Sequence, residues 1–169
     1  MQKLLLISDT NILIDIEDGS LTPIVFRLSY EIIVPDILFE LELKEQHTHL
    51  LAAGLKIKSL STESVKRTEA LNLKYPKPSI IDHSALALSI QEKCPLLTGD
   101  KDLRDAAKNE GVEVHGTIWI IEQLLTQKLI LQTQARRSFD SMKAKGSRLA
   151  WGDIEQLLNR YELIGTKNE

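Results

Sequence analysis

The sequence predicts an α/β fold: a three-layer α/β/α sandwich around a mostly parallel sheet of about five strands, followed by a C-terminal helical extension. Short apolar runs alternate with longer segments in which apolar residues recur every three or four positions. Several of these runs are continuous, which is typical of strands buried on both faces. After about residue 130 only helical patterns remain. We therefore expect one domain over residues 1–130 and a helical extension over residues 131–169.

In the first third of the chain, two apolar runs are expected as strands. Residues 4–7 form a continuous run that stops at a polar segment, and residues 31–34 are stopped by Pro35, which cannot extend a central strand. Pro35 followed by an acid also indicates a helix start, and Gly54 is a typical helix end. The helical segments expected here cover residues 12–16, 21–28 and 37 to about 51.

The middle of the chain continues the alternation of strand and helix. Residues 55–60 mostly alternate between apolar and polar, as in a strand with one wetter face, and further strands are expected at 95–98 and 112–115. The helices expected around them cover residues 62–72, 79–90, 102–109 and 118–125. Because successive strands are joined through helices, a parallel sheet is favoured.

The C-terminal segment is helical and basic. Helices are expected at 134–144 and 151–163, and Lys and Arg outnumber Asp and Glu after residue 127, although the whole chain has a net charge of −3. Contact with RNA and a solvated or packing role are both open for its cationic side chains, which are Arg136, Arg137, Lys143, Lys145 and Arg148.

Composition limits the classes of protein and of metal site. A chain of 169 residues, 43% hydrophobic, can bury the core of one α/β domain. Its single cysteine excludes an intramolecular disulfide, and its four scattered histidines lack the usual zinc spacing, so any metal is expected to be held by oxygen. No apolar stretch has the length of a membrane span or signal peptide, which predicts a soluble, cytoplasmic protein without membrane contact.

Acidic residues follow the expected strands. Asp9 comes after the first strand, Asp100 after the fourth, and Asp82 begins the helix that leads to the fourth. The carboxyl ends of parallel strands meet at one edge of the sheet, so these acids are expected to converge there. Either Glu40 or Glu42 can join them, but not both, because residues two apart on a helix point to different sides.

Each of these acids also has a structural interpretation. Asp9 can cap the following helix, and Asp82 can form a capping box with Ser79. Asp102 is expected to cap the helix after the fourth strand, which would leave Asp100 free to bind a metal.

A cluster of carboxylates persists only where protons or cations compensate its charge. Carboxylate oxygens suit Mg²⁺ or Mn²⁺, which can activate water and neutralise charge during phosphodiester hydrolysis. The side chains of Thr10, Asn11 and Thr98 can orient water or a carboxylate, and Asp102 can support the cluster.

Four segments that contain these acids resemble motifs of the PIN-domain family. The segments are residues 7–15, 34–41, 81–88 and 97–102. The resemblance selects Glu40 over Glu42, and it implies that Asp9, Glu40, Asp82 and Asp100 are the catalytic and metal-binding acids. Residues 111–117 and 129–130 further resemble a VapC-like ribonuclease subgroup that carries a C-terminal helical tail.

The resemblance implies an Mg²⁺- or Mn²⁺-dependent endoribonuclease on an α/β/α sandwich. Many bacterial members are toxins held inactive by a small antitoxin, which makes RNA and such an antitoxin the expected partners, and apolar helix faces make a homodimer plausible. Two other functions stay open. One is a non-catalytic PIN-like binding or scaffold module; the other is phosphomonoester hydrolysis, which commonly needs a second acid where Asn11 stands.

Overall fold

A five-stranded parallel sheet forms the centre of the protein. The computed structural model describes residues 2–166 and gives the strand order β3-β2-β1-β4-β5, with every neighbouring pair parallel. The strands are β1 (Leu4–Ser8), β2 (Tyr30–Pro35), β3 (Lys56–Lys58), β4 (Leu96–Leu97) and β5 (Val114–His115). The predicted fold class is confirmed, although β3, β4 and β5 are shorter than the sequence pattern indicated.

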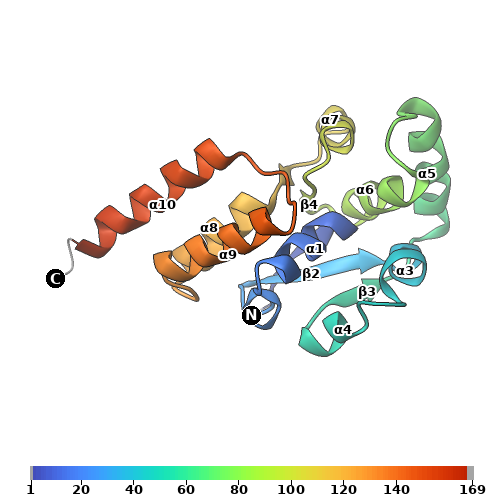
Figure 1. Ribbon diagram of the computed structural model, residues 1–169. Helices are drawn as coiled ribbons and strands as arrows, with labels where there is room; N and C mark the ends of the chain where they lie inside the picture. Colours follow the sequence, from blue (N-terminus) through green and yellow to red (C-terminus); the bar gives the residue numbers. More distant parts are fainter. Residues whose placement is uncertain (1, 167–169) are drawn as a thin grey trace.

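Helices cover the sheet and continue beyond it (Figure 1). They are α1 (Thr10–Asp18), α2 (Thr22–Val25), α3 (Asp36–Leu38), α4 (His49–Ala53), α5 (Thr62–Lys74), α6 (Ile80–Glu92), α7 (Lys101–Asn109), α8 (Thr117–Thr126), α9 (Gln132–Ala144) and α10 (Trp151–Thr166). Helix α6 packs against β1 and β2 and is followed outward by α5, whereas α1, α8 and α9 contact one another. No helix in the described part of the chain is both long and apolar enough to span a membrane.

The single helix predicted from residue 37 to about 51 is wrong. The chain forms α3, then a π-helical segment η1 (Phe39–Leu43), then a turn, and only then α4. The backbone N–H of Lys44 donates to the carbonyl of Phe39 at 2.8 Å, a bond between residues five apart that inserts an extra residue into the turn. The helix predicted over residues 21–28 is also shorter. It ends early in hydrogen bonds between residues three apart, such as Arg27 N–H to Ile24 O.

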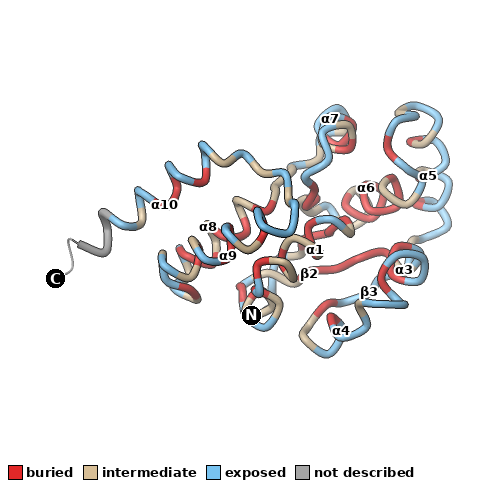
Figure 2. Tube along the Cα trace, viewed as in Figure 1, coloured by how far each residue is buried: buried red, intermediate tan, exposed pale blue. Residues whose placement is uncertain are grey.

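One hydrophobic core joins the sheet, α6 and the C-terminal helices. Leu6 and Ile7 of β1 are buried, and α6 is buried continuously from His83 to Ser89 (Figure 2). From α9, Phe139 and Met142 belong to the same cluster. The domain division at residue 130 stays a prediction, but the packing of α9 already indicates that the first helix of the extension supports the sheet domain.

We expect Phe139→Ala to destabilise the protein by about 3–5 kcal/mol, because this 2% exposed ring would leave a cavity between α9 and the core. Urea unfolding followed by circular dichroism measures the change. The control is Leu131→Ala, at a side chain that is 70% exposed, which should change stability by less than about 0.5 kcal/mol. A loss below about 1 kcal/mol in Phe139→Ala would show that α9 contributes little to the stability of the sheet.

Candidate functional site

The switch point of the sheet lies beside β1. From β1 the chain first moves to β2 and β3 on one side, and later returns to β4 and β5 on the other. Crevices at such points, outside the carboxyl ends of the strands, are the usual ligand sites of open α/β sheets. Asp9 follows β1 directly, and Thr98 and Asp100 follow β4, so the sequence placed these acids correctly along the fold.

Asp9 is a buried carboxylate that joins two elements. Its side chain is 2% exposed. One oxygen, Oδ1, accepts the backbone N–H of Ile12 at 3.0 Å and so caps α1, while Oδ2 accepts the hydroxyl of Thr98 at 2.5 Å. The capping role and the role at the strand edge are therefore filled by the two oxygens of one carboxylate.

Burial raises the pKa of Asp9 from 3.8 to about 6. The hydrogen bonds from Thr98 and Ile12 oppose this rise, and the negative charges of Asp82 and Asp100 add to it. The influence of both acids on Asp9 means that the three carboxyl groups share one electrostatic environment. Near neutral pH this environment favours either a proton or a cation.

Asp82 and Asp100, whose charges act on Asp9, each make a hydrogen bond at the start of a helix. Asp82 Oδ2 accepts the backbone N–H of Ser79 at 3.0 Å, and the Ser79 hydroxyl accepts the N–H of Asp82, so the expected capping box is present at α6. Asp100 Oδ1 accepts the N–H of Leu103 at 2.8 Å and caps α7. These bonds each use one carboxylate oxygen.

The prediction that Asp102 caps α7 and leaves Asp100 free is wrong. Helix α7 begins at Lys101, one residue earlier than expected, which makes Asp100 the N-cap. Asp102 lies in the first helical turn and pairs with Lys77 at 3.8 Å. Sequence alone could not separate the two acids, because both stand at acceptable cap positions.

The structure separates Glu40 from Glu42. Both lie in η1 and are exposed, but Glu40 pairs with Lys44 at 2.8 Å, whereas Glu42 accepts the hydroxyl of Thr10, the residue after Asp9. The π-helical turn shifts the register of η1, so a count based on an ordinary helix does not reveal which glutamate faces α1. We find no contact that joins Glu40 to the three aspartates among the described residues.

The polar residues predicted to orient the site differ in burial. Thr98 is fully buried; its hydroxyl donates to Asp9 and accepts the backbone N–H of Asp100 at 3.1 Å, so it links two of the acids. Thr10 is half-buried, and Asn11 is exposed in the first turn of α1. Of these three, Thr98 has the contacts of a residue that fixes the geometry of the acids.

The aspartates are near one another without forming a closed cage. Across residues 2–166, the condition that three possible ligand atoms lie within 4.8 Å of one another is met by Glu17, His47 and His49 and not by the aspartates. A cation held by the aspartates would therefore keep part of its water shell. Mg²⁺ commonly does so, binding through one or two carboxylates and several waters.

A known protein family matches most of this chain. The model of the DUF3368 family, a PIN domain, matches residues 5–162. The chain belongs to the PIN-domain family. PIN domains are typically nucleases and generally use divalent metal ions, in agreement with the cluster of acids at the switch point.

The fold also resembles a solved structure. A PilT N-terminus domain protein from the hyperthermophilic archaeon Sulfolobus solfataricus P2 is 14% identical, and the match covers 73% of this chain and 92% of that chain with a TM-score of 0.47. No curated protein matches the sequence.

We expect the raised pKa of Asp9 to make this PIN domain less stable at higher pH when metal is absent. Because the folded-state pKa lies above the unfolded value, the contribution to stability is complete below about pH 4 and is lost as the pH rises through about 6. The loss is on the order of 3 kcal/mol.

Asp9→Asn removes the titrating group, so its free energy of unfolding in chelator should change less between about pH 4 and pH 8 than that of the wild type. Urea unfolding at a series of pH values measures both curves. Asp105→Asn is the control, because this acid is 56% exposed and pairs with Lys101 at the surface. Parallel curves for the wild type and Asp9→Asn would contradict the assignment.

Proposed function

We propose that this PIN domain is an endoribonuclease that depends on Mg²⁺ or Mn²⁺. The observation that supports the proposal best is the buried carboxyl group of Asp9, whose pKa is raised by burial and by the nearby charges of Asp82 and Asp100. Such a group gains stability when a cation replaces the proton. Membership of a family of typical nucleases supports phosphodiester hydrolysis as the reaction.

In this proposal Asp9, Asp82 and Asp100 bind the ion through oxygens and intervening water. Each of the three has a carboxylate oxygen fixed by a helix cap, which holds its orientation before substrate arrives. The Thr98 hydroxyl connects Asp9 to Asp100 through two hydrogen bonds, one to each residue. When bound, the ion would supply an activated water and compensate negative charge at the phosphate.

We further propose that Glu42, rather than Glu40, is the fourth acid. Its contact with Thr10 brings it to the first residue of α1, next to Asp9. Glu40 is instead neutralised by Lys44 on the same helical segment. The resemblance of residues 34–41 to the family motif favoured Glu40, so the two glutamates are alternatives that experiment can separate.

We propose RNA as the partner, and two cations of the basic extension already have contacts within the chain. Arg136 is paired with Glu155 at 3.3 Å, and Lys143 lies over the ring of Trp151 at 5.2 Å, so both have intramolecular roles. A VapC-like toxin role and a small antitoxin stay predictions from the resemblance, and a homodimer stays a prediction from the apolar helix faces.

We expect the purified full-length chain to cleave single-stranded RNA with Mn²⁺ and to stop in chelator. Asp9→Asn, Asp82→Asn and Asp100→Asn should each reduce the cleavage rate on the order of 100-fold or more, because loss of a metal-binding group costs at least as much as loss of its supporting hydrogen bonds. Gel assays on labelled RNA measure the rates. Asp105→Asn should cleave like the wild type.

Thermal melting with Mn²⁺ separates binding from turnover. A rise in melting temperature that is lost in Asp100→Asn, together with no cleavage of single-stranded or structured RNA, would support a non-catalytic binding module instead. Equal cleavage by the wild type and the three aspartate variants would reject the proposed nuclease site.

Glu42→Gln should lower the cleavage rate by about tenfold or more, whereas Glu40→Gln should stay within about twofold of the wild type. The pair is well matched, since both glutamates are exposed and lie in the same π-helical segment. Rates at saturating Mn²⁺ and the Mn²⁺ concentration for half-maximal rate should be measured for both. The reverse order of effects would assign the fourth position to Glu40.

A further inference from the structure

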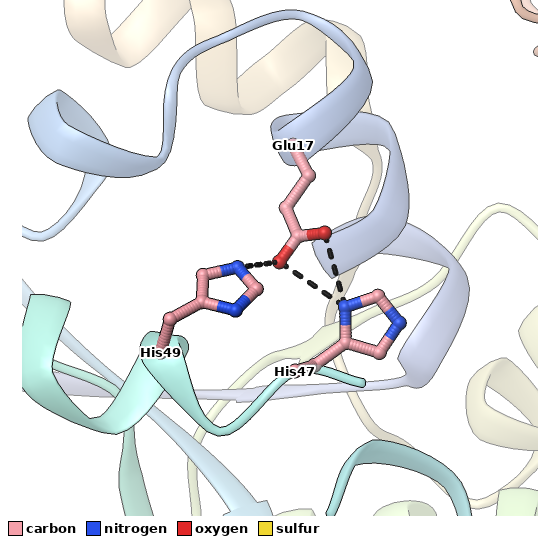
Figure 3. A group of neighbouring side chains, drawn as sticks. All are labelled: Glu17, His47 and His49. Atoms are coloured by element: carbon pink, nitrogen blue, oxygen red, sulfur yellow. Dashed lines mark hydrogen bonds and ion pairs between the residues drawn. The ribbon is translucent and has the colours of Figure 1, made fainter. Parts of the chain in front are cut away.

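Two histidines and a glutamate gather at the far end of α1 (Figure 3). His47 Nδ1 lies 3.0 Å from Glu17 Oε2 and 3.2 Å from Oε1, and His49 Nε2 lies 2.6 Å from Oε1. The possible ligand atoms of the three residues all lie within 4.8 Å of one another. Figure 3 shows both imidazoles directed at one carboxylate.

The fold creates this group from residues that are far apart in the sequence. Glu17 is in the last turn of α1, His47 is in the turn after η1, and His49 is the first residue of α4. The π-helical bond of Lys44 and the following bond from His47 N–H to Leu43 O bend the chain back toward α1. The break in the predicted helix therefore brings the two imidazoles together.

The donor atoms suit a zinc ion. Two imidazole nitrogens and one carboxylate oxygen are a common catalytic zinc set, and a fourth position would be left for water. With metal–ligand bonds of about 2.0–2.2 Å and tetrahedral angles, neighbouring ligand atoms lie roughly 3.3 Å apart. The observed separations from Glu17 are within an ångström of this value, and the three possible ligand atoms lie within 4.8 Å of one another.

Burial favours a site with a fixed geometry over three solvated side chains. Glu17 and His47 are 20% and 19% exposed, which leaves them held by the surrounding chain, while His49 is 56% exposed and leaves a path for an ion from solvent. Two imidazoles share one carboxylate here, and each places a ring nitrogen within 3.2 Å of a Glu17 oxygen. A cation would allow all three donors to be used at once.

We propose that Glu17, His47 and His49 form a zinc site that fastens the turn between η1 and α4 to α1. The site is separate from the aspartates: Thr10 and Glu17 are seven residues apart on α1, a rise of about 10 Å. It differs from them in ligand chemistry, with imidazole nitrogens in place of carboxylates alone. The proposal does not rest on nuclease activity, because its test measures binding.

Isothermal titration of Zn²⁺ into the metal-free full chain tests the site. The Asp9→Asn, Asp100→Asn double variant is titrated as well, so that ions bound by the aspartates are excluded. We expect one zinc per chain in the double variant, and in the wild type a site of the same affinity beside any ion that the aspartates bind. Glu17→Gln, His47→Gln and His49→Gln should each weaken binding by at least about tenfold, and Glu17→Gln keeps a hydrogen-bond acceptor while it loses the charge.

His115→Gln is the matched histidine control, because His115 pairs with Glu113 and stacks on Trp119 away from this group. Its zinc affinity should equal that of the wild type. Co²⁺ added to the wild type should give the visible absorption of a four-coordinate ion, a readout that does not depend on the folding of any variant. Absence of stoichiometric zinc binding and of this absorption, or full affinity in Glu17→Gln, would overturn the proposal and leave the group as a set of hydrogen bonds.

Discussion

The site depends on the two hydrogen bonds that the carboxylate of Asp9 accepts. One oxygen starts α1 at the end of β1, and the other holds Thr98 at the end of β4, so a single side chain fixes the two strands that border the switch point. This arrangement requires a carboxyl group at a position that is almost closed to water, and burial raises its pKa to about 6. The fold therefore maintains an environment that is costly for an isolated charge and favourable for a charge paired with a cation.

Helix α1, which Asp9 caps, makes hydrogen bonds to several other segments of the chain. Thr10, at its start, contacts Glu42 of η1. Farther along, Asp15 accepts hydroxyl groups from Thr117 of α8 and from Ser147 of the turn between α9 and α10, both at 2.8 Å. Each of these bonds leads to a different segment, so α1 contacts the π-helical segment, the helix after β5 and the C-terminal extension.

Local patterns predicted the strands, most helices and the positions of Asp9 and Asp100 after β1 and β4, because apolar runs and helix starts depend on near neighbours in sequence. They could not decide whether Asp100 or Asp102 caps α7, since one residue of difference at a helix start leaves the pattern unchanged. They also gave one helix where η1 interrupts it, and that error hid both the contact of Glu42 and the approach of His47 and His49 to Glu17. The expectation that any metal must be held by oxygen failed to consider such a group, because its members come from two separate segments.

The π-helical segment thus has consequences at both ends of α1. It turns Glu42 toward the start of α1, where Glu42 contacts Thr10, and the turn that follows it brings His47 to Glu17 at the end of α1. On an ordinary helix Glu42 and His47, five residues apart, would point in directions about 140° apart. A π-turn costs hydrogen-bond regularity, so its presence is explained best by what it positions. Thr10 at the start of α1 contacts Glu42 of η1, and Glu17 at the end of α1 contacts His47 and His49. The residue types that η1 and the following turn bring to α1 therefore differ between its two ends.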